Sequence, residues 1–317
     1  MDAVPTLITQ ADPIELVGAT IAQLNRIILG KEQQLRLSIA CMLARGHLLI
    51  EDIPGVGKTT LAHALAESLG LSYQRIQFTS DLLPADIIGV SVFERETSTF
   101  NFHKGPVFAQ LVLADEINRA TPKAQSALLE AMEEHQVTAD GQTYPLTNPF
   151  FVIGTQNPVY QIGTYPLPES QLDRFLMRIQ LGYPGAQAER ALLQGEDRRD
   201  LLRKVSAALD EHELSALQRE VQQVHAAPAL LDYVQALVEF TRQAPEYAAG
   251  LSPRAALALL HAARAWALID GRRHVVPEDV QAVLPGVVGH RLMPGAEARR
   301  LNGTDVAQHL VKEVAIP

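Results

Sequence analysis

The feature that most constrains the fold is an alternation of short apolar runs with helical segments in the first half of the chain. The apolar runs have the length and composition of buried strands, and the segments between them carry apolar residues at three- and four-residue steps. The predicted strands are His47–Ile53, Tyr73–Phe78, Gln110–Asp115, Phe150–Gln156 and Met177–Leu181. The predicted helices are two between Pro13 and Ala44, one ending near Leu69 and one over about Pro122–Glu134. This order predicts an α/β fold, with a parallel sheet covered by helices on both faces.

The character of the sequence changes after Gly182-Tyr-Pro-Gly185, because helical periodicity continues from there without a convincing strand. The predicted helices are Gln187–Gln194, Glu213–Val224, Ala229–Gln243, Pro253–Ile269 and Pro277–Val283. We therefore predict two domains, an α/β domain over residues 1–183 and a smaller all-helical domain over residues 184–317. The segment 294–317 has no interpretable pattern and is either an extension of the second domain or a docking tail.

Two segments interrupt the first domain. Residues 90–104 alternate apolar and polar side chains around a polar centre, which indicates a hairpin. Residues 135–147 contain Asp140-Gly141, a pair that favours the positive φ angles of a two-residue hairpin turn. We expect both segments to fold as two-stranded hairpins inserted in the α/β domain.

The segment Asp52–Thr60, with the sequence DIPGVGKTT, lies between the first predicted strand and a helix. Gly55 and Gly57 permit backbone conformations that are closed to other residues and aim successive N–H groups inward. Lys58 would then reach the β- and γ-phosphates of a nucleotide, and Thr59 would bind Mg²⁺. The general phosphate-loop pattern has a glycine where this chain has Asp52, so the match is incomplete. The alternative interpretation of the segment is a glycine-rich turn with a surface lysine. The flanking strand and helix favour a phosphate site formed by Pro54, Gly55, Val56, Gly57, Lys58, Thr59 and Thr60.

Two further predicted strands end in polar residues. In a phosphoryl-transfer site Asp115 would hold Mg²⁺ and Glu116 would polarise the attacking water, whereas the alternative for this acid pair is to cap the next helix. Asn157 could contact the γ-phosphate and position the same water, or it could be a turn residue before Pro158. Because the ends of parallel strands share one edge of a sheet, we favour a single site that includes both segments.

Three arginines stand near the ends of predicted elements. Arg174 and Arg178 lie close to a predicted strand, and Arg254 follows Ser252 and Pro253, which suit the N-cap and the first position of a helix. Because the positive end of a helix disfavours a cation, Arg254 in the first turn suggests an anionic partner. An ordinary surface arginine would also tolerate this position.

Composition excludes several classes of protein. The chain has 317 residues and a formal net charge of −9, which argues against general nucleic-acid binding because phosphate neutralisation needs a basic surface. Cys41 is the single cysteine, so an internal disulfide and a multi-cysteine metal site are both ruled out. The N-terminus lacks the pattern of a signal peptide, and no apolar run approaches the ~18 residues of a membrane span. We expect a cytoplasmic protein that is not integral to a membrane.

Taken together, the motifs resemble those of MoxR-family AAA+ ATPases. The matching segments are Ile53–Thr59, Leu113–Ala120, Gln125–Met132, Thr155–Pro158, Gly163–Glu169, Leu172–Phe175 and Ser252–Arg254. They occur in the family's order between about Gly30 and Leu284. The resemblance implies an AAA+ core followed by a helical lid, with ATP and Mg²⁺ bound at the seam between them. Residues 90–104 and 135–147 resemble the helix-2 insert and the pre-sensor-1 insert of this clade.

The resemblance also implies a role for each candidate site residue: Walker A for Lys58 and Thr59, Walker B for Asp115 and Glu116, sensor 1 for Asn157, the arginine finger for Arg174 and sensor 2 for Arg254. For Arg119 and Arg178 two readings stay open. Either residue assists Arg174 across a subunit boundary, or it pairs with acids in its own chain.

The function implied by the resemblance is ATP hydrolysis that drives a motor or chaperone acting on a partner protein, often one with a VWA domain or a metal cofactor. An arginine finger acts in a neighbour's site, so hydrolysis would require a ring, a hexamer by resemblance. No nucleic-acid partner is expected. An AAA+ nucleic-acid remodeller is nevertheless the first alternative, with Arg95, His103 and Lys104 as its main basic residues in the hairpins. A monomeric P-loop kinase or GTPase is the second, although the chain has no Asn-Lys-x-Asp guanine motif.

Overall fold

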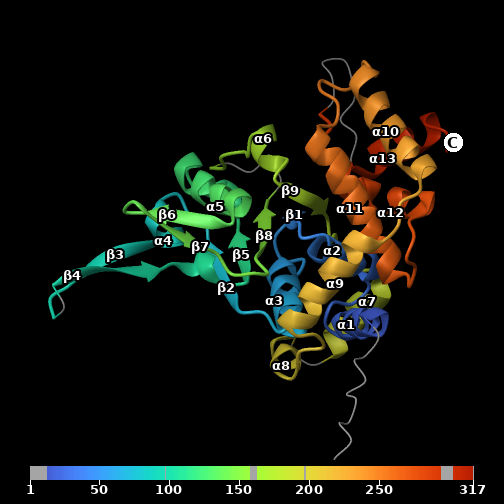
Figure 1. Ribbon diagram of the computed structural model, residues 1–317. Coiled ribbons are helices and arrows are strands. Elements are labelled where there is room, and N and C mark those ends of the chain that lie inside the picture. Colours follow the sequence, from blue (N-terminus) through green and yellow to red (C-terminus); the bar gives the residue numbers. More distant parts are fainter. Residues whose placement is uncertain (1–12, 97, 158–162, 196–197, 294–302, 317) are drawn as a thin grey trace, which may run out of the picture.

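A five-stranded sheet forms the centre of the molecule, with strand order β2-β5-β8-β1-β9 (Figure 1). The computed structural model describes residues 13–96, 98–157, 163–195, 198–293 and 303–316. The sheet strands are β1 (His47–Glu51), β2 (Tyr73–Gln77), β5 (Leu111–Asp115), β8 (Phe151–Gln156) and β9 (Phe175–Ile179). All neighbouring pairs are parallel, so every strand ends at the same edge of the sheet. We call this edge the C-terminal edge and the opposite one the N-terminal edge.

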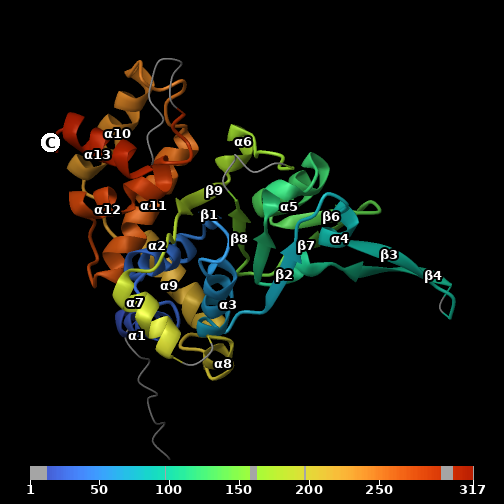
Figure 2. The same ribbon diagram turned by 180° about the vertical axis from the view of Figure 1, so that it is seen from behind.

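Helices cover both faces of the sheet (Figures 1 and 2). Alternate residues of β1 face different layers, because Leu48 and Ile50 belong to one hydrophobic cluster and Leu49 belongs to the other. The first cluster includes residues of α1 (Pro13–Ile27), α2 (Glu32–Leu43) and α3 (Lys58–Ser68), and the second includes residues of α4 (Pro84–Ile88) and α5 (Pro122–Glu134). The predicted α/β class with helices on both faces is confirmed.

The described residues after β9 form helices, as predicted: α7 (Ala186–Gln194), α8 (Arg198–Arg203), α9 (Glu211–Gln223), α10 (Pro228–Gln243), α11 (Pro253–Ile269), α12 (Pro277–Val288) and α13 (Gly303–Glu313). A short helix that was not predicted, α6 (Glu169–Leu172), precedes β9. Helix α11 packs on α2, and α12 packs on β9, so the first hydrophobic cluster runs from the sheet into the helical part. The domain boundary between residues 183 and 184 stays a prediction. None of the described helices is long and apolar enough to cross a membrane.

The largest difference from the predicted element ends is at the end of α12. Helix α12 does not stop at Val283 but continues through Pro285 to Val288. Proline removes a hydrogen bond from a helix interior, yet Leu284, Val287 and Val288 are fully buried here, and their burial outweighs that loss. Strand β9 lies two residues earlier than predicted. Helix α13 falls inside the segment 294–317 that showed no pattern, of which residues 294–302 and 317 lie outside the described part of the chain.

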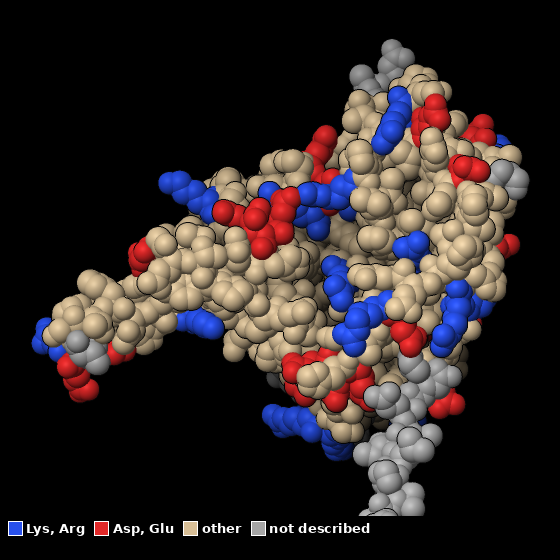
Figure 3. All heavy atoms as spheres, in the orientation of Figure 1, with Lys and Arg blue, Asp and Glu red and all other residues tan. Residues whose placement is uncertain are grey.

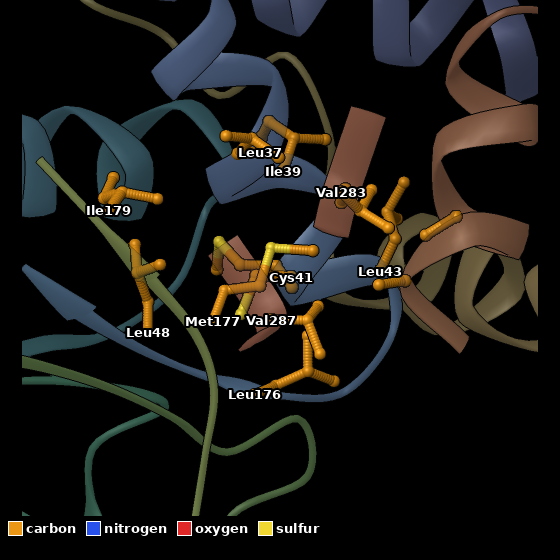
Figure 4. Close-up of a cluster of buried hydrophobic side chains, with 14 of the residues drawn as sticks. Leu37, Ile39, Cys41, Leu43, Leu48, Leu176, Met177, Ile179, Val283 and Val287 are labelled. Atoms are coloured by element: carbon orange, nitrogen blue, oxygen red, sulfur yellow. The ribbon is translucent and has the colours of Figure 1, made fainter. Parts of the chain in front are cut away.

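The single cysteine lies where the sheet and the helical part share their core. Figure 4 shows Cys41 of α2 beside Met177 of β9 and Val287 of α12. Its side chain is fully buried, and its thiol donates to the carbonyl oxygen of His47 at 3.4 Å. Burial raises the pKa of the Cys41 thiol well above its usual range, because a thiolate would lose its hydration there.

Both predicted hairpins are present. Strand β3 (Gly89–Glu94) pairs with β4 (Thr99–Lys104), and β6 (Gln136–Ala139) pairs with β7 (Gln142–Pro145). The β3–β4 hairpin forms an arm that projects from the body (Figure 1). Phe102 on the arm stacks on Tyr144 of the second hairpin, with ring centroids 4.3 Å apart, so the hairpins contact each other. Farther out, Phe93 and Phe100 face each other and remain exposed.

Candidate nucleotide-binding site

The predicted phosphate loop, Pro54–Thr60, connects β1 to α3 at the C-terminal edge of the sheet. Gly55 and Gly57 have φ angles of +85° and +95°, which are the left-handed conformations that favour glycine. Helix α3 begins at Lys58 directly after Gly57, so its positive end faces the loop. The local geometry therefore fits the binding of a polyphosphate.

Lys58 occupies the centre of this loop. Its side chain is buried, and its ammonium group donates to the carbonyl oxygen of Asp52 and, at 3.1 Å, to Oδ1 of Asn157. Burial lowers the pKa of Lys58, while the negative charges of Asp52, Asp115 and Glu116 act in the opposite direction. The ammonium group is thus held among oxygen atoms at the position where phosphates would lie.

Asp52 replaces the first glycine of the general loop pattern, and its carboxylate has two partners. Oδ1 accepts a hydrogen bond from the backbone N–H of Ile53 at 2.8 Å, and Oδ2 accepts one from the N–H of Gly182 at 2.6 Å. Gly182 stands in the connection between β9 and α7. Asp52 therefore ties the phosphate loop to the segment that leads into the helical part, which glycine could not do.

Asp115 and Thr59 lie close together at the end of β5. Oδ2 of Asp115 lies 3.5 Å from Oγ1 of Thr59 and accepts from the guanidinium group of Arg75 at 2.7 Å, while Oδ1 accepts from the hydroxyl of Thr155 at 2.6 Å. A hydroxyl and a carboxylate beside a phosphate site fit Mg²⁺, which typically uses one or two protein oxygens and completes its shell with phosphates and water. Among the described residues no group of three or more His, Cys, Asp or Glu side chains could hold a metal ion.

The Glu116 carboxylate is held by three donors from three different segments. Oε1 accepts from Nδ2 of Asn157 at 3.0 Å, and Oε2 accepts from Arg119 at 2.9 Å and from Gln77 at 3.2 Å. Glu116 has a φ angle of +56° and its side chain makes no capping hydrogen bond to the following 3-10 turn. A non-glycine residue in this conformation costs of order 1 kcal/mol and is typical of functional sites. This geometry favours the water-polarising interpretation over helix capping.

Asn157 connects the phosphate loop to the acid pair after β5, because its amide oxygen accepts from Lys58 and its amide nitrogen donates to Glu116. The side chain is 4% exposed, so it is not an ordinary surface turn residue. Pro158, on which the turn interpretation depended, lies outside the described residues. The structure thus brings together all the predicted site residues that follow β1, β5 and β8.

Three residues that hold the acids were missed by the sequence analysis, namely Arg75, Gln77 and Thr155. Arg75 and Gln77 alternate with the buried Ile76 on β2, and the register places Gln77 opposite Asp115. Polar residues at every second position of a strand were therefore a usable signal, although their partner depends on the order of strands in the sheet. Thr155 lies in one of the matching segments, but nothing indicated its contact with Asp115, because a threonine is common in a buried strand.

The two arginines that had been left open both pair with acids of the same chain. Arg119 binds Glu116 as described above. Arg178 binds Glu51 with an N–O distance of 2.7 Å and also donates to the carbonyl oxygen of Gly289. Arg178 therefore connects the end of β1 to the C-terminal end of α12.

Arg174 and Arg254 lie at the N-terminal edge, away from the phosphate loop. Strand β9 pairs in parallel with β1, with Phe175 opposite His47, so Arg174 lies beside the start of β1 while the loop follows its end. A strand of five residues spans roughly 15 Å. The expected arrangement, with Arg254 and the phosphate loop around one nucleotide at the seam of one chain, is therefore not what the structure contains.

Arg254 occupies the first turn of α11, with Ser252 as the N-cap accepting from the N–H of Ala255 at 3.1 Å, as predicted. The expected anionic partner is Glu133 at the end of α5, which also binds Arg174 with an N–O distance of 2.8 Å. Glu133, Arg174 and Arg254 line a cavity of about 300 Å³. Its other polar lining residues include Arg45, His47, Asp173, His261 and Arg291. Figure 3 shows acidic and basic side chains gathered along this border between α5 and the helical part.

Both the α/β part and the helical part of the chain match known protein families. Residues 47–177 match the family of ATPases associated with various cellular activities (AAA), and residues 239–310 match the AAA lid domain. The chain is 44% identical over 310 residues to the uncharacterized protein YeaC of Bacillus subtilis, which covers 97% of each. It is 39% identical to the chaperone MoxR1 of Mycobacterium tuberculosis over 97% of this chain and 84% of that protein. The solved structure of a candidate ATPase from Cytophaga hutchinsonii has a TM-score of 0.88 and 35% identity, and the match covers 96% of each chain.

Proposed function

Because the chain belongs to the MoxR family of AAA+ ATPases, we propose that it hydrolyses ATP with Mg²⁺ and uses the energy to remodel, activate or mature a partner protein. The observation that carries this proposal is the meeting of Lys58, Asp115, Glu116 and Asn157 at one edge of the sheet. Lys58 begins the helix that follows β1, Asp115 ends β5, and Glu116 and Asn157 directly follow β5 and β8. Hydrogen bonds link Lys58, Asn157 and Glu116, and Asp115 lies 3.5 Å from the hydroxyl of Thr59. Together they supply a phosphate ligand, a metal ligand and a carboxylate for water.

The chain's own residues would act as follows. Backbone N–H groups of Pro54–Thr60 and the ammonium group of Lys58 would bind the phosphates, and Lys58 would leave the carbonyl of Asp52 to do so. Thr59 and Asp115 would hold Mg²⁺, which neutralises charge on the phosphates when bound. Glu116 would orient the attacking water and accept its proton. Arg119 occupies Oε2 of Glu116 through an ion pair, so this contact would have to loosen before that oxygen could accept a proton.

We further propose that Arg174 and Arg254 act in the site of a neighbouring subunit. They lie at the N-terminal edge, so they do not reach the nucleotide of their own chain, but a head-to-tail contact would bring them to the C-terminal edge of the next chain. A closed series of such contacts gives a ring, which we propose to be a hexamer. An arginine supplied in this way can accelerate phosphoryl transfer by several powers of ten.

Mixed rings test this proposal. Arg174→Ala subunits retain their own phosphate loop and Glu116, whereas Glu116→Gln subunits retain both arginines. Each variant alone is expected to lose hydrolysis. A mixture in equal amounts should regain turnover at roughly a quarter of its interfaces, where an intact loop meets intact arginines. Mixed rings of demonstrated composition that regain no activity would contradict action across the subunit boundary.

The partner would contact the two hairpins, according to the same proposal. In support, Phe93 and Phe100 are 50% and 72% exposed on the arm, and large exposed aromatic side chains are typical of contact sites. A VWA-domain protein or a metal-cofactor protein is the partner class we propose by family. The Glu116→Gln variant, held with ATP, should retain this partner in a pull-down, and Phe100→Ser in the same background should lose it. Equal recovery with both would place the contact elsewhere.

A further inference from the structure

Glu133 holds both of the arginines that we propose act on the neighbour. Its Oε2 binds Arg174 at 2.8 Å, and its Oε1 accepts from Nη2 of Arg254. Arg174 precedes β9 and Arg254 lies in the first turn of α11, so one carboxylate at the end of α5 joins three separate segments. No sequence motif led us to expect this contact.

Among the described residues that line the cavity, Glu133 is the only acid that binds Arg174 and Arg254. Arg45, Arg174, Arg254 and Arg291 all line it. The second acid, Asp173, is occupied by Arg291 at 2.6 Å and by the hydroxyl of Ser252 at 3.2 Å. Without Glu133 the two guanidinium groups would repel each other, and their long side chains would spread into many rotamers.

Glu133 is itself held in a defined position. The ring of the buried His47 bonds the carbonyl oxygen of Met132, the residue before Glu133, at 3.3 Å. The other ring nitrogen of His47 accepts from the N–H of Val152 at 3.0 Å, which fixes the ring to β8. The end of α5 is therefore anchored to the N-terminal edge of the sheet.

Both arginines stay available to a ligand from outside the chain. Arg174 and Arg254 are 28% and 49% exposed. A guanidinium group carries five N–H donors in a planar fork, so donors remain after one has bound a carboxylate oxygen. A pair of such groups held at a fixed separation matches a polyphosphate, which presents several oxygen atoms with negative charge.

We propose that Glu133 is a positioning residue, which holds Arg174 and Arg254 as one unit for the triphosphate bound by the neighbouring subunit. This inference rests on the proposed ring. Glu133 does not touch the nucleotide in this role. It fixes the spacing of the two guanidinium groups before the neighbour arrives, so that their ordering is not required during assembly or hydrolysis.

Three variants test the proposal. Glu133→Gln removes the charge, and Glu133→Asp keeps the charge but shortens the side chain so that it no longer spans both arginines. Both should lower kcat of the assembled ring roughly tenfold, because the two groups lose their spacing. Nucleotide affinity of dilute, single subunits should not change, since that site lies at the other edge of the sheet. Glu134→Gln removes the same charge from the next, exposed residue of α5 and should leave kcat unchanged.

Mixed rings separate a positioning role from a structural one. Glu133→Gln subunits mixed with Glu116→Gln subunits should regain activity to the same extent as Arg174→Ala subunits do. Normal turnover of the Glu133 variants, or full activity of Glu133→Asp alone, would overturn the proposal. So would a defect that Glu116→Gln subunits fail to rescue while they do rescue Arg174→Ala. If they rescue neither variant, action across the boundary itself is wrong, and the role of Glu133 falls with it.

Discussion

The two edges of the central sheet are built in different ways. At the C-terminal edge Lys58 and Asn157 are 8% and 4% exposed; Asn157 directly follows β8, and Lys58 begins the helix after the loop that follows β1. At the N-terminal edge Glu133, Arg174 and Arg254 come from a helix end, a strand start and a helix start, and all three are more exposed. The site residues of the first edge lie in short segments of sequence that follow β1, β5 and β8. The second is assembled from distant segments and, on our proposal, becomes functional only beside another subunit.

The strongest test of this difference compares Lys58→Ala with Arg254→Ala in dilute, single subunits. Lys58→Ala should abolish nucleotide binding, at least roughly a hundredfold loss in affinity, because a buried ammonium group that serves the phosphates is removed. Arg254→Ala should leave this affinity within a factor of two, since the residue lies at the other edge. A fluorescent ATP analogue titrated at low protein concentration measures both. Equal losses would mean that the two edges serve one nucleotide within a chain.

The next test concerns Asp52, which connects the C-terminal edge to the helical part. Asp52→Gly restores the general loop pattern, yet it should lower the free energy of unfolding by about 3 kcal/mol, because two backbone N–H groups lose a charged acceptor. Asp52→Asn keeps one acceptor oxygen and should lose about half of that. Urea denaturation monitors both variants. A glycine variant as stable as the original chain would show that the two hydrogen bonds contribute nothing.

The smallest expected effect is a pH dependence at the N-terminal edge. Burial lowers the pKa of His47 to about 4, below the ordinary value of 6.5. Between these values the unfolded state binds a proton that the folded state excludes, so stability falls as the pH is lowered and does not depend on this group above pH 6.5. From pH 7 to pH 5 the loss should be about 2 kcal/mol.

His47→Asn provides the control, because asparagine can accept from Val152 but does not titrate. The free energy of unfolding of this variant should fall less than that of the original chain over the same pH range. His290, which is also buried with a lowered pKa, remains in both proteins and cancels in the comparison. Parallel pH profiles for the two proteins would exclude His47 as the source of the dependence.

The same contrast explains what could be predicted from the sequence. The phosphate loop, the acid pair and Asn157 were predictable because each follows an apolar run, and parallel strands bring such ends together. The contact of Glu133 with Arg254 was not predictable, because it depends on where α5 ends relative to α11, and α11 is placed by its packing on α2 and α12. The contact of Arg75 with Asp115 was missed for a related reason, because it depends on the placement of β2 next to β5. The predicted end of α12 was wrong because the burial of side chains beyond Pro285 outweighs the tendency of proline to end a helix.

The buried Cys41 makes the folded chain unreactive toward thiol reagents, since its side chain has no exposed area and its thiolate is strongly disfavoured. Because it is the only cysteine in the chain, any modification must come from molecules that have opened the junction between α2, β9 and α12. The rate of modification therefore reports how often the sheet and the helical part separate. Measured with and without ATP, it gives the free energy by which the nucleotide holds the two parts together.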